Sequence, residues 1–207
     1  MKAVLISTQS KWVEKIANRK KTIEVRKNAP KQVPFKCYIY CTSAKPYLYR
    51  EANPPFELFL DSQLYKGKGY DDRLFSSKVI GEFICDKVDK IIPLQHTYYN
   101  YIGLPIANIT EYGIWNDDLA QMCLKKKEID NYGKGKMLYG WHISDLKIYD
   151  KPKELSEFYT IDESGSDCCI ACVYHETPLE EMPCRTCTGE RRYLYRPPQS
   201  WCYVEEL

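Results

Sequence analysis

Apolar and polar residues alternate over several short stretches of the chain, and this pattern predicts β-strands. In the clearest case, Phe, Cys, Ile and Cys occupy every second position from 35 to 41, with Lys or Tyr between them. A period of two places one set of side chains on a buried face and the other set toward water. Strands are predicted at residues 2–7, 22–26, 35–41, 79–85, 137–144, 146–149 and 201–205.

Residues 10–17 show helical spacing instead. Trp12, Val13 and Ile16 fall on one apolar stripe of a short helix. Ser10 is the expected N-cap, and Asn18 is the expected left-handed residue that ends this helix.

A second helix is predicted at residues 117–127, whose C-terminal lysines suit the helix dipole. Residues 46–70 contain two adjacent prolines and two glycines, so they are predicted to be a loop. The pattern shows short strands, a few brief helices and no repeating β-α-β units. It therefore predicts an α+β fold, built as a small curled or closed barrel.

The longest stretch without charge, residues 91–110, contains prolines, asparagines and tyrosines, so it is not expected to cross a membrane as a helix. The sequence opens without a secretory signal pattern. Both observations predict a soluble, cytoplasmic protein with reduced cysteines.

Positive charge is concentrated at the start of the chain. Residues 1–50 carry twelve Lys and Arg against two Glu, a net charge of +10, whereas the remaining 157 residues carry −8. Such asymmetry favours a surface that faces a polyanion, although a solvated lysine-rich face is the common alternative. The 18 tyrosines could stack on nucleic-acid bases or simply furnish strands.

The densest group of charges is the run from Arg19 to Arg26, directly after the first predicted helix. On a strand, Glu24 and Arg26 share a face, and Lys21 lies where the strand begins. Such a cluster can hold a phosphate or a base edge. The alternative is an ordinary surface ion pair that contributes little.

This run resembles the G-x-K-x-x-E-x-R signature of ASCH domains, which belong to the PUA-like superfamily. Lys21, Glu24 and Arg26 match the Lys, Glu and Arg of the signature, whereas Arg19 stands where the family usually has glycine. Further resemblance lies at residues 79–83, 141–144 and 196–204.

The resemblance implies a PUA-like β-barrel with a cleft beside the first helix that accepts RNA or a modified nucleoside. The residues expected to bind the ligand are Lys21, Glu24 and Arg26 of the signature, with Lys20 and Arg19 adding attraction for phosphate. Some relatives are amidohydrolases that remove an acyl group from N4-acetylcytidine, and Lys21 matches their essential lysine. They carry threonine where this chain has Glu24. A carboxylate there would keep Lys21 protonated, so we prefer binding and regard Lys21 as catalytic only under the hydrolase alternative.

Six of the ten cysteines lie within the last 40 residues. Two CxxC pairs have the spacing of zinc knuckles and predict a structural zinc ion held by four thiolates, with Cys168 and His175 as alternative ligands. Free thiols on a loop are the other interpretation. The proposed zinc ligands are Cys169, Cys172, Cys184 and Cys187.

Three regions are predicted: the barrel at residues 1–163, a zinc-binding insertion at 164–195 and a closing strand at 196–207. The insertion could also be the contact surface of a protein-interaction module. His142, in a predicted strand, is expected to be a structurally satisfied histidine rather than a catalyst. The cysteines outside the tail, Cys37, Cys41, Cys85 and Cys123, are expected to be buried thiols.

Overall fold

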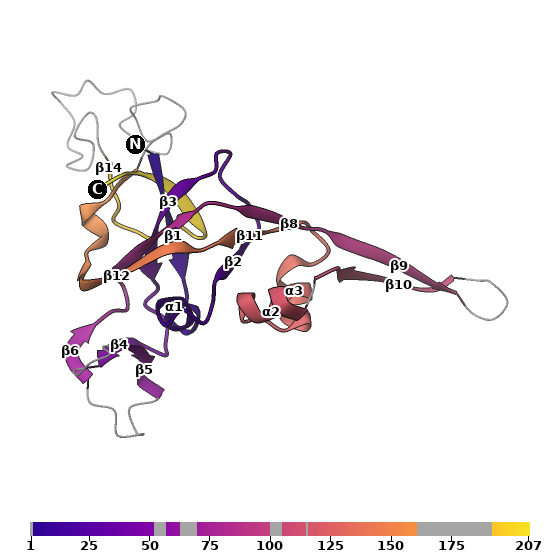
Figure 1. Cartoon of the computed structure of the whole chain (residues 1–207), viewed down its shortest axis with the longest axis horizontal. Coiled ribbons are helices and arrows are strands. Elements are labelled where there is room, and N and C mark those ends of the chain that lie inside the picture. Colours follow the sequence, from indigo (N-terminus) through magenta and orange to yellow (C-terminus); the bar gives the residue numbers. More distant parts are fainter. Residues whose placement is uncertain (1, 52–56, 63–69, 100–104, 115, 161–191) are drawn as a thin grey trace, which may run out of the picture. The chain divides into compact units, whose positions relative to one another are not determined.

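The computed structural model describes residues 2–51, 57–62, 70–99, 105–114, 116–160 and 192–207 (Figure 1). Its contacts divide the chain into two compact units. Unit 1 comprises residues 1–14, 35–83 and 147–207, and unit 2 comprises residues 15–34 and 84–146. No helix in the described part of the chain is long and apolar enough to span a membrane.

A mixed, seven-stranded sheet forms most of unit 1. Strand β1 (Lys2–Thr8) pairs in parallel with β3 (Phe35–Cys41) and antiparallel with β15 (Trp201–Glu205). The strand order is β12-β7-β3-β1-β15-β13-β14, in which the further members are β7 (Val79–Cys85), β12 (Ser144–Lys153), β13 (Tyr159–Thr160) and β14 (Arg192–Tyr193).

The α+β class is confirmed, but no closed barrel is found among the described strands. The sheet ends at β12 on one side and at β14 on the other. The predicted barrel strands at 22–26 and 137–144 instead pair with each other in a separate sheet of unit 2, so they do not close the larger sheet.

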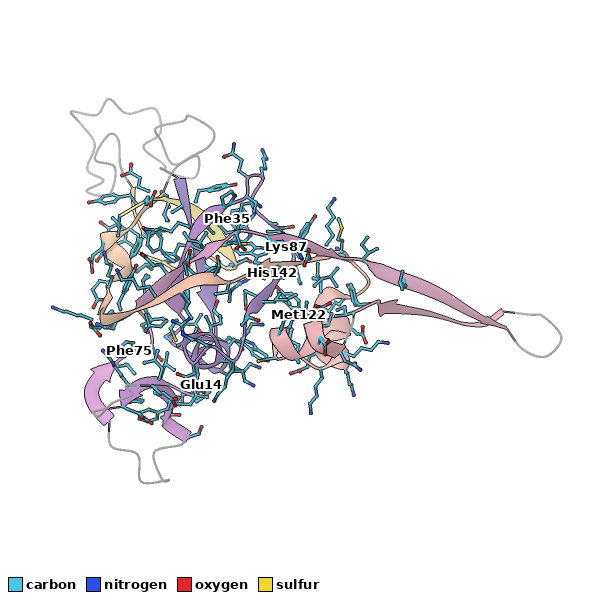
Figure 2. All side chains as sticks on the ribbon, in the orientation of Figure 1. Glu14, Phe35, Phe75, Lys87, Met122 and His142 are labelled. Atoms are coloured by element: carbon cyan, nitrogen blue, oxygen red, sulfur yellow. The ribbon has the colours of Figure 1, made fainter. Side chains whose placement is uncertain are left out.

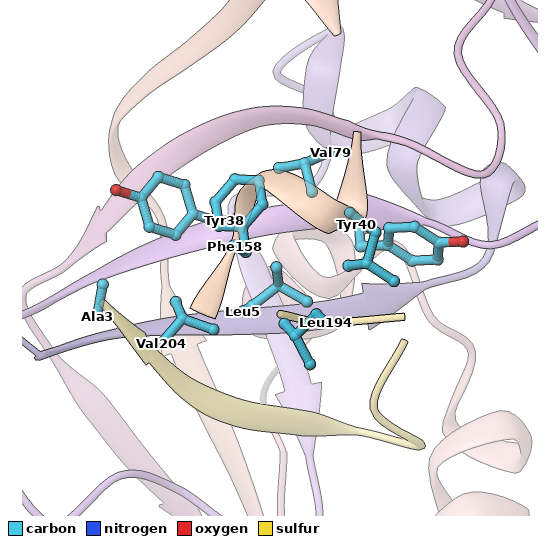
Figure 3. Packing of buried hydrophobic residues seen from close by; sticks show 9 residues of the cluster. Ala3, Leu5, Tyr38, Tyr40, Val79, Phe158, Leu194 and Val204 are labelled. Atoms are coloured by element: carbon cyan, nitrogen blue, oxygen red, sulfur yellow. The ribbon is translucent and has the colours of Figure 1, made fainter. Parts of the chain in front are cut away.

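One face of the larger sheet packs into the core shown in Figure 3. Leu5 of β1 and Tyr38 of β3 are fully buried there, and the ring of Phe158 meets that of Tyr38 edge-on at 4.9 Å. Phe158 follows the short 3-10 helix η2 (Leu155–Glu157). The opposite face of β3 carries Cys37 and Cys41, which are fully buried as predicted.

Unit 1 also contains a three-stranded sheet that the sequence pattern missed. Its strands are β4 (Leu48–Glu51), β5 (Leu58–Leu60) and β6 (Tyr70–Leu74), so the loop predicted for residues 46–70 was wrong for the part that the structure describes. Leu48, Leu58 and Phe59 are buried. Strands of three or four residues are too short for alternation to distinguish them from a loop.

Helix α1 (Ser10–Ala17) has different ends from those predicted. Gln9 accepts the first backbone hydrogen bonds, from Trp12 and Val13, while the Ser10 hydroxyl bonds to the Ala44 and Pro46 carbonyls instead of capping the helix. The left-handed residue is Arg19, with φ 57°, rather than Asn18. Glycine adopts this conformation without steric cost, whereas here a residue with a side chain adopts it.

Unit 2 contains a three-stranded sheet in the order β2 (Ile23–Arg26), β11 (Leu138–His142) and β8 (Val88–Ile91). A hairpin of β9 (Pro93–Tyr99) and β10 (Pro105–Tyr112) follows β8 along the chain (Figure 1).

Two helices replace the single helix predicted at 117–127: α2 (Asn116–Met122) and α3 (Lys126–Gly133). Cys123 lies between them with φ 52°, a left-handed conformation that ends α2. Cys123 is half-buried and not fully buried as predicted, whereas Cys85 is fully buried.

Candidate functional site

The two faces of β2 differ in chemistry. Ile23 and Val25 point into the apolar core of unit 2, which includes Met122 of α2 and Ile129 of α3. The alternate residues, Glu24 and Arg26, therefore lie together on the other face. Because the apolar face packs against both helices, the position of the charged face is set by the core.

Lys21, Glu24 and Arg26 form a continuous ionic cluster. Glu24 bridges the two cations, with Oε2 3.4 Å from Lys21 Nζ and Oε1 3.0 Å from Arg26 Nη2. The side chains are only 2, 8 and 7 % exposed, respectively. The structure thus brings together the three residues that match the signature, and their burial contradicts the alternative of an ordinary surface ion pair.

Burial changes the energetics of this cluster. Transferring each ion from water into a protein costs several kcal/mol, which only close partners and further hydrogen bonds offset. The three side chains together carry a net charge of +1 when ionised. A buried excess of positive charge favours an anion bound nearby, because its field is less screened than that of a surface lysine.

Lys21 has a second partner that the sequence did not indicate. Its Nζ donates a hydrogen bond of 2.6 Å to the carbonyl oxygen of Met122, which is the last residue of α2. Met122 is labelled in Figure 2. Carbonyl groups at the C-terminal end of a helix carry a partial negative charge and favour a cation. Lys21 Nζ therefore has two acceptors, the Glu24 carboxylate and the Met122 carbonyl.

Exposed cations lie next to this cluster along the chain. Arg19 and Lys20 precede Lys21, and Lys27 follows Arg26; all three are exposed. Arg19 Nη2 donates a hydrogen bond of 3.4 Å to the carbonyl oxygen of Leu146, and the Cys123 thiol donates to the Lys20 carbonyl. The thiol contact holds the backbone of the segment at Lys20, and the side chains of Arg19, Lys20 and Lys27 are exposed to water.

Tyr132 of α3 is a candidate site residue that the sequence analysis missed. Its side chain is 38 % exposed, and Lys27 Nζ lies 5.0 Å from its ring centroid. Burial of the hydroxyl and the nearby Glu24 charge raise the pKa of Tyr132, partly offset by Arg26 and the Lys27 backbone. An exposed aromatic ring therefore lies beside the ionic cluster. No local pattern signals it, because Tyr132 is more than 100 residues from β2.

The basic residues at the start of the sequence are divided between the two units. Seven of the twelve basic residues in the first 50 belong to unit 2 and five to unit 1. Unit 2 nevertheless has 14 Lys and Arg against nine Asp and Glu, a net charge of +5, and unit 1 has −3. Unit 2 contains both the signature and the excess positive charge.

His142 is held by a carboxylate, as expected of a satisfied histidine. Its Nε2 lies 2.6 Å from Asp89 Oδ2, and Lys87 Nζ lies 2.8 Å from the same oxygen. Figure 2 labels His142 and Lys87. Partial burial acts to raise the pKa of Asp89, but the hydrogen bonds from Lys87 and His142 outweigh it and lower that pKa. The Cys85 thiol nearby has a pKa raised to about 12 by burial, so it is not a nucleophile at neutral pH.

The predicted zinc ligands Cys169, Cys172, Cys184 and Cys187, with the alternatives Cys168 and His175, lie outside the described residues. No group of side chains suited to a metal ion occurs in the part that is described. The strands on either side of residues 161–191 pair antiparallel, Tyr159 with Tyr193 and Thr160 with Arg192. The intervening segment therefore leaves and re-enters the sheet at adjacent positions, as is usual for an insertion.

No family model and no curated protein matches this sequence. The structure is similar to solved ASCH proteins. ASCH from Zymomonas mobilis matches with a TM-score of 0.43 and 15% identity, over 74% of this chain and 73% of that chain. A Tyr-to-Phe variant of the Zymomonas mobilis ASCH protein matches with a TM-score of 0.42 and 15% identity, over 74% and 76%.

Proposed function

We propose that the protein binds RNA or a modified nucleotide at unit 2, through the charged segment 19–27 and Tyr132. The observation that carries the proposal is the buried Lys21–Glu24–Arg26 cluster, with its net positive charge, beside an exposed tyrosine ring. A nucleotide combines an anionic phosphate with a flat base, and these two features match the two kinds of side chain.

The residues of the site would have different roles. Arg19, Lys20 and Lys27 are exposed and would contact phosphates directly. Tyr132 would stack on a base. The ionic cluster of Lys21, Glu24 and Arg26 would lie beneath the ligand. It would hold β2 in place and add to the electrostatic attraction for the anion.

The amidohydrolase alternative requires Lys21 to act as a base or nucleophile, which it can do only as the neutral amine. In the structure its Nζ instead donates a hydrogen bond to the Met122 carbonyl and pairs with the Glu24 carboxylate, so both contacts use the amino group as a hydrogen-bond donor. The contacts of Lys21 therefore support binding over hydrolysis.

Removing the ring of Tyr132 is expected to weaken RNA binding. Tyr132→Ala should raise the Kd for a single-stranded oligonucleotide by about 5- to 100-fold, which is the range for loss of one stacking contact. Tyr132→Phe keeps the ring and should bind within about twofold of the wild type. Fluorescence anisotropy with a labelled oligouridylate would measure both Kd values, and Tyr195→Ala, which removes another exposed tyrosine, is the matched control.

The salt dependence of the same binding tests the phosphate contacts. Each lost contact should reduce the slope of log Kd against log salt by about 0.7, so Lys27→Ala should show this reduction, whereas the exposed Lys151→Ala should not. Binding that is insensitive to salt, or equal in Tyr132→Ala and the wild type, would contradict the proposal.

We also propose that Cys169, Cys172, Cys184 and Cys187 bind one structural zinc ion. Two CxxC pairs can supply the four thiolates of a closed tetrahedral site, in which zinc has no open position for catalysis. The paired strands β13 and β14 support this, because they hold the two ends of the segment side by side. A protein-contact role for the segment stays a prediction.

Protein purified without chelator is expected to contain about one zinc ion per chain. Cys172→Ser should lose it, since a thiolate ligand is removed, whereas Cys202→Ser should retain it because Cys202 lies in β15. Cys168→Ser tests whether Cys168 is a zinc ligand in place of Cys169. If this variant retains zinc, Cys168 is not a ligand. Mass spectrometry of the metal content would measure all four proteins, and wild type without zinc would contradict the proposal.

A further inference from the structure

Unit 1 has two lysine–aromatic pairs in segments that the side chain of Ser10 links. Lys11 Nζ lies 4.6 Å from the ring centroid of Trp12, in the first turn of α1. Lys45 Nζ lies 5.9 Å from the ring centroid of Tyr47, just before β4. Both lysines are exposed and both rings are partly exposed. We refer to these four residues as the Trp12–Tyr47 surface.

Ser10 links the two segments that carry the pairs. Its hydroxyl oxygen lies 3.4 Å from the Ala44 carbonyl oxygen and within hydrogen-bond distance of the Pro46 carbonyl oxygen. These two carbonyls flank Lys45, and Ser10 itself precedes Lys11. The start of α1 and residues 44–47 are therefore fixed next to each other, although they are more than 30 positions apart in the sequence.

The charge on this surface differs from that at the other lysine–aromatic pairs of unit 1. Lys36, which lies over Tyr38, forms ion pairs with Glu82 and Glu206. Lys153 lies over Tyr149, whose hydroxyl donates a hydrogen bond to Glu82.

Among the described residues, by contrast, no carboxylate forms an ion pair with Lys11 or Lys45. The first turn of α1 contains no acidic residue either, so the positive end of the helix dipole adds to the two charges.

We propose that the Trp12–Tyr47 surface is a second contact for single-stranded nucleic acid. Trp12 and Tyr47 would stack on bases, which are flat and can replace the lysine ammonium groups over the rings. The displaced ammonium groups of Lys11 and Lys45 would then bind the phosphates. The proposal goes beyond the proposed function, since this surface belongs to unit 1 and needs no residue of the ionic cluster.

A test in the Tyr132→Ala background separates the two surfaces, because that change removes the stacking contact proposed for unit 2. Unlabelled oligouridylate of about ten nucleotides, within the site sizes of single-strand binders, is expected to quench the tryptophan fluorescence of this variant. The quenching should disappear on Trp12→Phe, because the reporter is lost, while binding measured by anisotropy persists.

Trp12→Ala should weaken that binding by about 5- to 100-fold. The double change Lys11→Ala with Lys45→Ala should reduce the slope of log Kd against log salt concentration by about 1.4. Lys151→Ala is the matched control, and far-UV circular dichroism establishes that each variant is folded. Tryptophan fluorescence unchanged by RNA, or affinity unchanged by Trp12→Ala in a folded protein, would overturn this inference. Either result would leave the proposal for unit 2 intact if Tyr132→Ala alone weakens binding.

Discussion

Replacing Glu24 with glutamine is expected to lower the free energy of unfolding by about 3–5 kcal/mol. Glutamine has nearly the same shape but no charge, so Lys21 and Arg26 would remain buried without the carboxylate that bridges them. An uncompensated buried charge is among the costliest defects in a protein core. Urea denaturation followed by circular dichroism would measure the loss.

The matched control for this prediction is Asp150→Asn. Asp150 forms an ion pair with Arg50 at 3.0 Å, but its side chain is 93 % exposed. Such a pair contributes about 1 kcal/mol or less. If Glu24→Gln and Asp150→Asn lowered the free energy of unfolding equally, the buried ionic cluster would contribute no more to stability than an exposed ion pair.

Replacing all three charged side chains of the ionic cluster with apolar ones tests its role in RNA binding separately from its role in stability. Lys21→Met, Glu24→Leu and Arg26→Met together leave no charge in this cluster, and apolar replacement of such a cluster is often neutral or stabilising. We expect this triple variant to recover most of the stability lost in Glu24→Gln and yet to bind RNA more weakly. Wild-type affinity in a folded triple variant would show that the ionic cluster is not part of the site.

Replacing Gly81 with alanine is expected to lower the free energy of unfolding by about 2–3 kcal/mol. A methyl group at Gly81 of β7 would lie 2.4 Å from the backbone oxygen of Lys147 and 3.1 Å from the Cα of Ile148, both in β12. Backbone atoms of a paired strand cannot rotate away, so the two strands would have to separate. Urea denaturation would again measure the effect.

Gly113→Ala is the control for this second prediction. A methyl group there would lie 2.9 Å from Leu94 Cδ1, but the Leu94 side chain is 46 % exposed and can rotate toward water. The cost should therefore stay below about 1 kcal/mol. Equal free energies of unfolding for Gly81→Ala and the wild type would mean that β12 leaves room for a methyl group at Gly81.

The largest errors of the sequence analysis concern elements stabilised by distant contacts. Strands β4 and β5 are only four and three residues long, and burial of Leu48 and Leu58 stabilises them rather than any local alternation. The predicted end of α1 was wrong by one residue, because Asn18 has the better intrinsic preference for a left-handed conformation but Arg19 adopts it.

The sequence by itself determined the strands at the centre of unit 1 and the shared face of Glu24 and Arg26. Both follow from the two-residue period of a strand, which is a local property of the backbone. Only the tertiary structure decided that the charged cluster is buried, that the Met122 carbonyl binds Lys21 and that Tyr132 lies beside them. Burial and partners depend on segments about 100 residues away, and no local pattern encodes which of them will pack together.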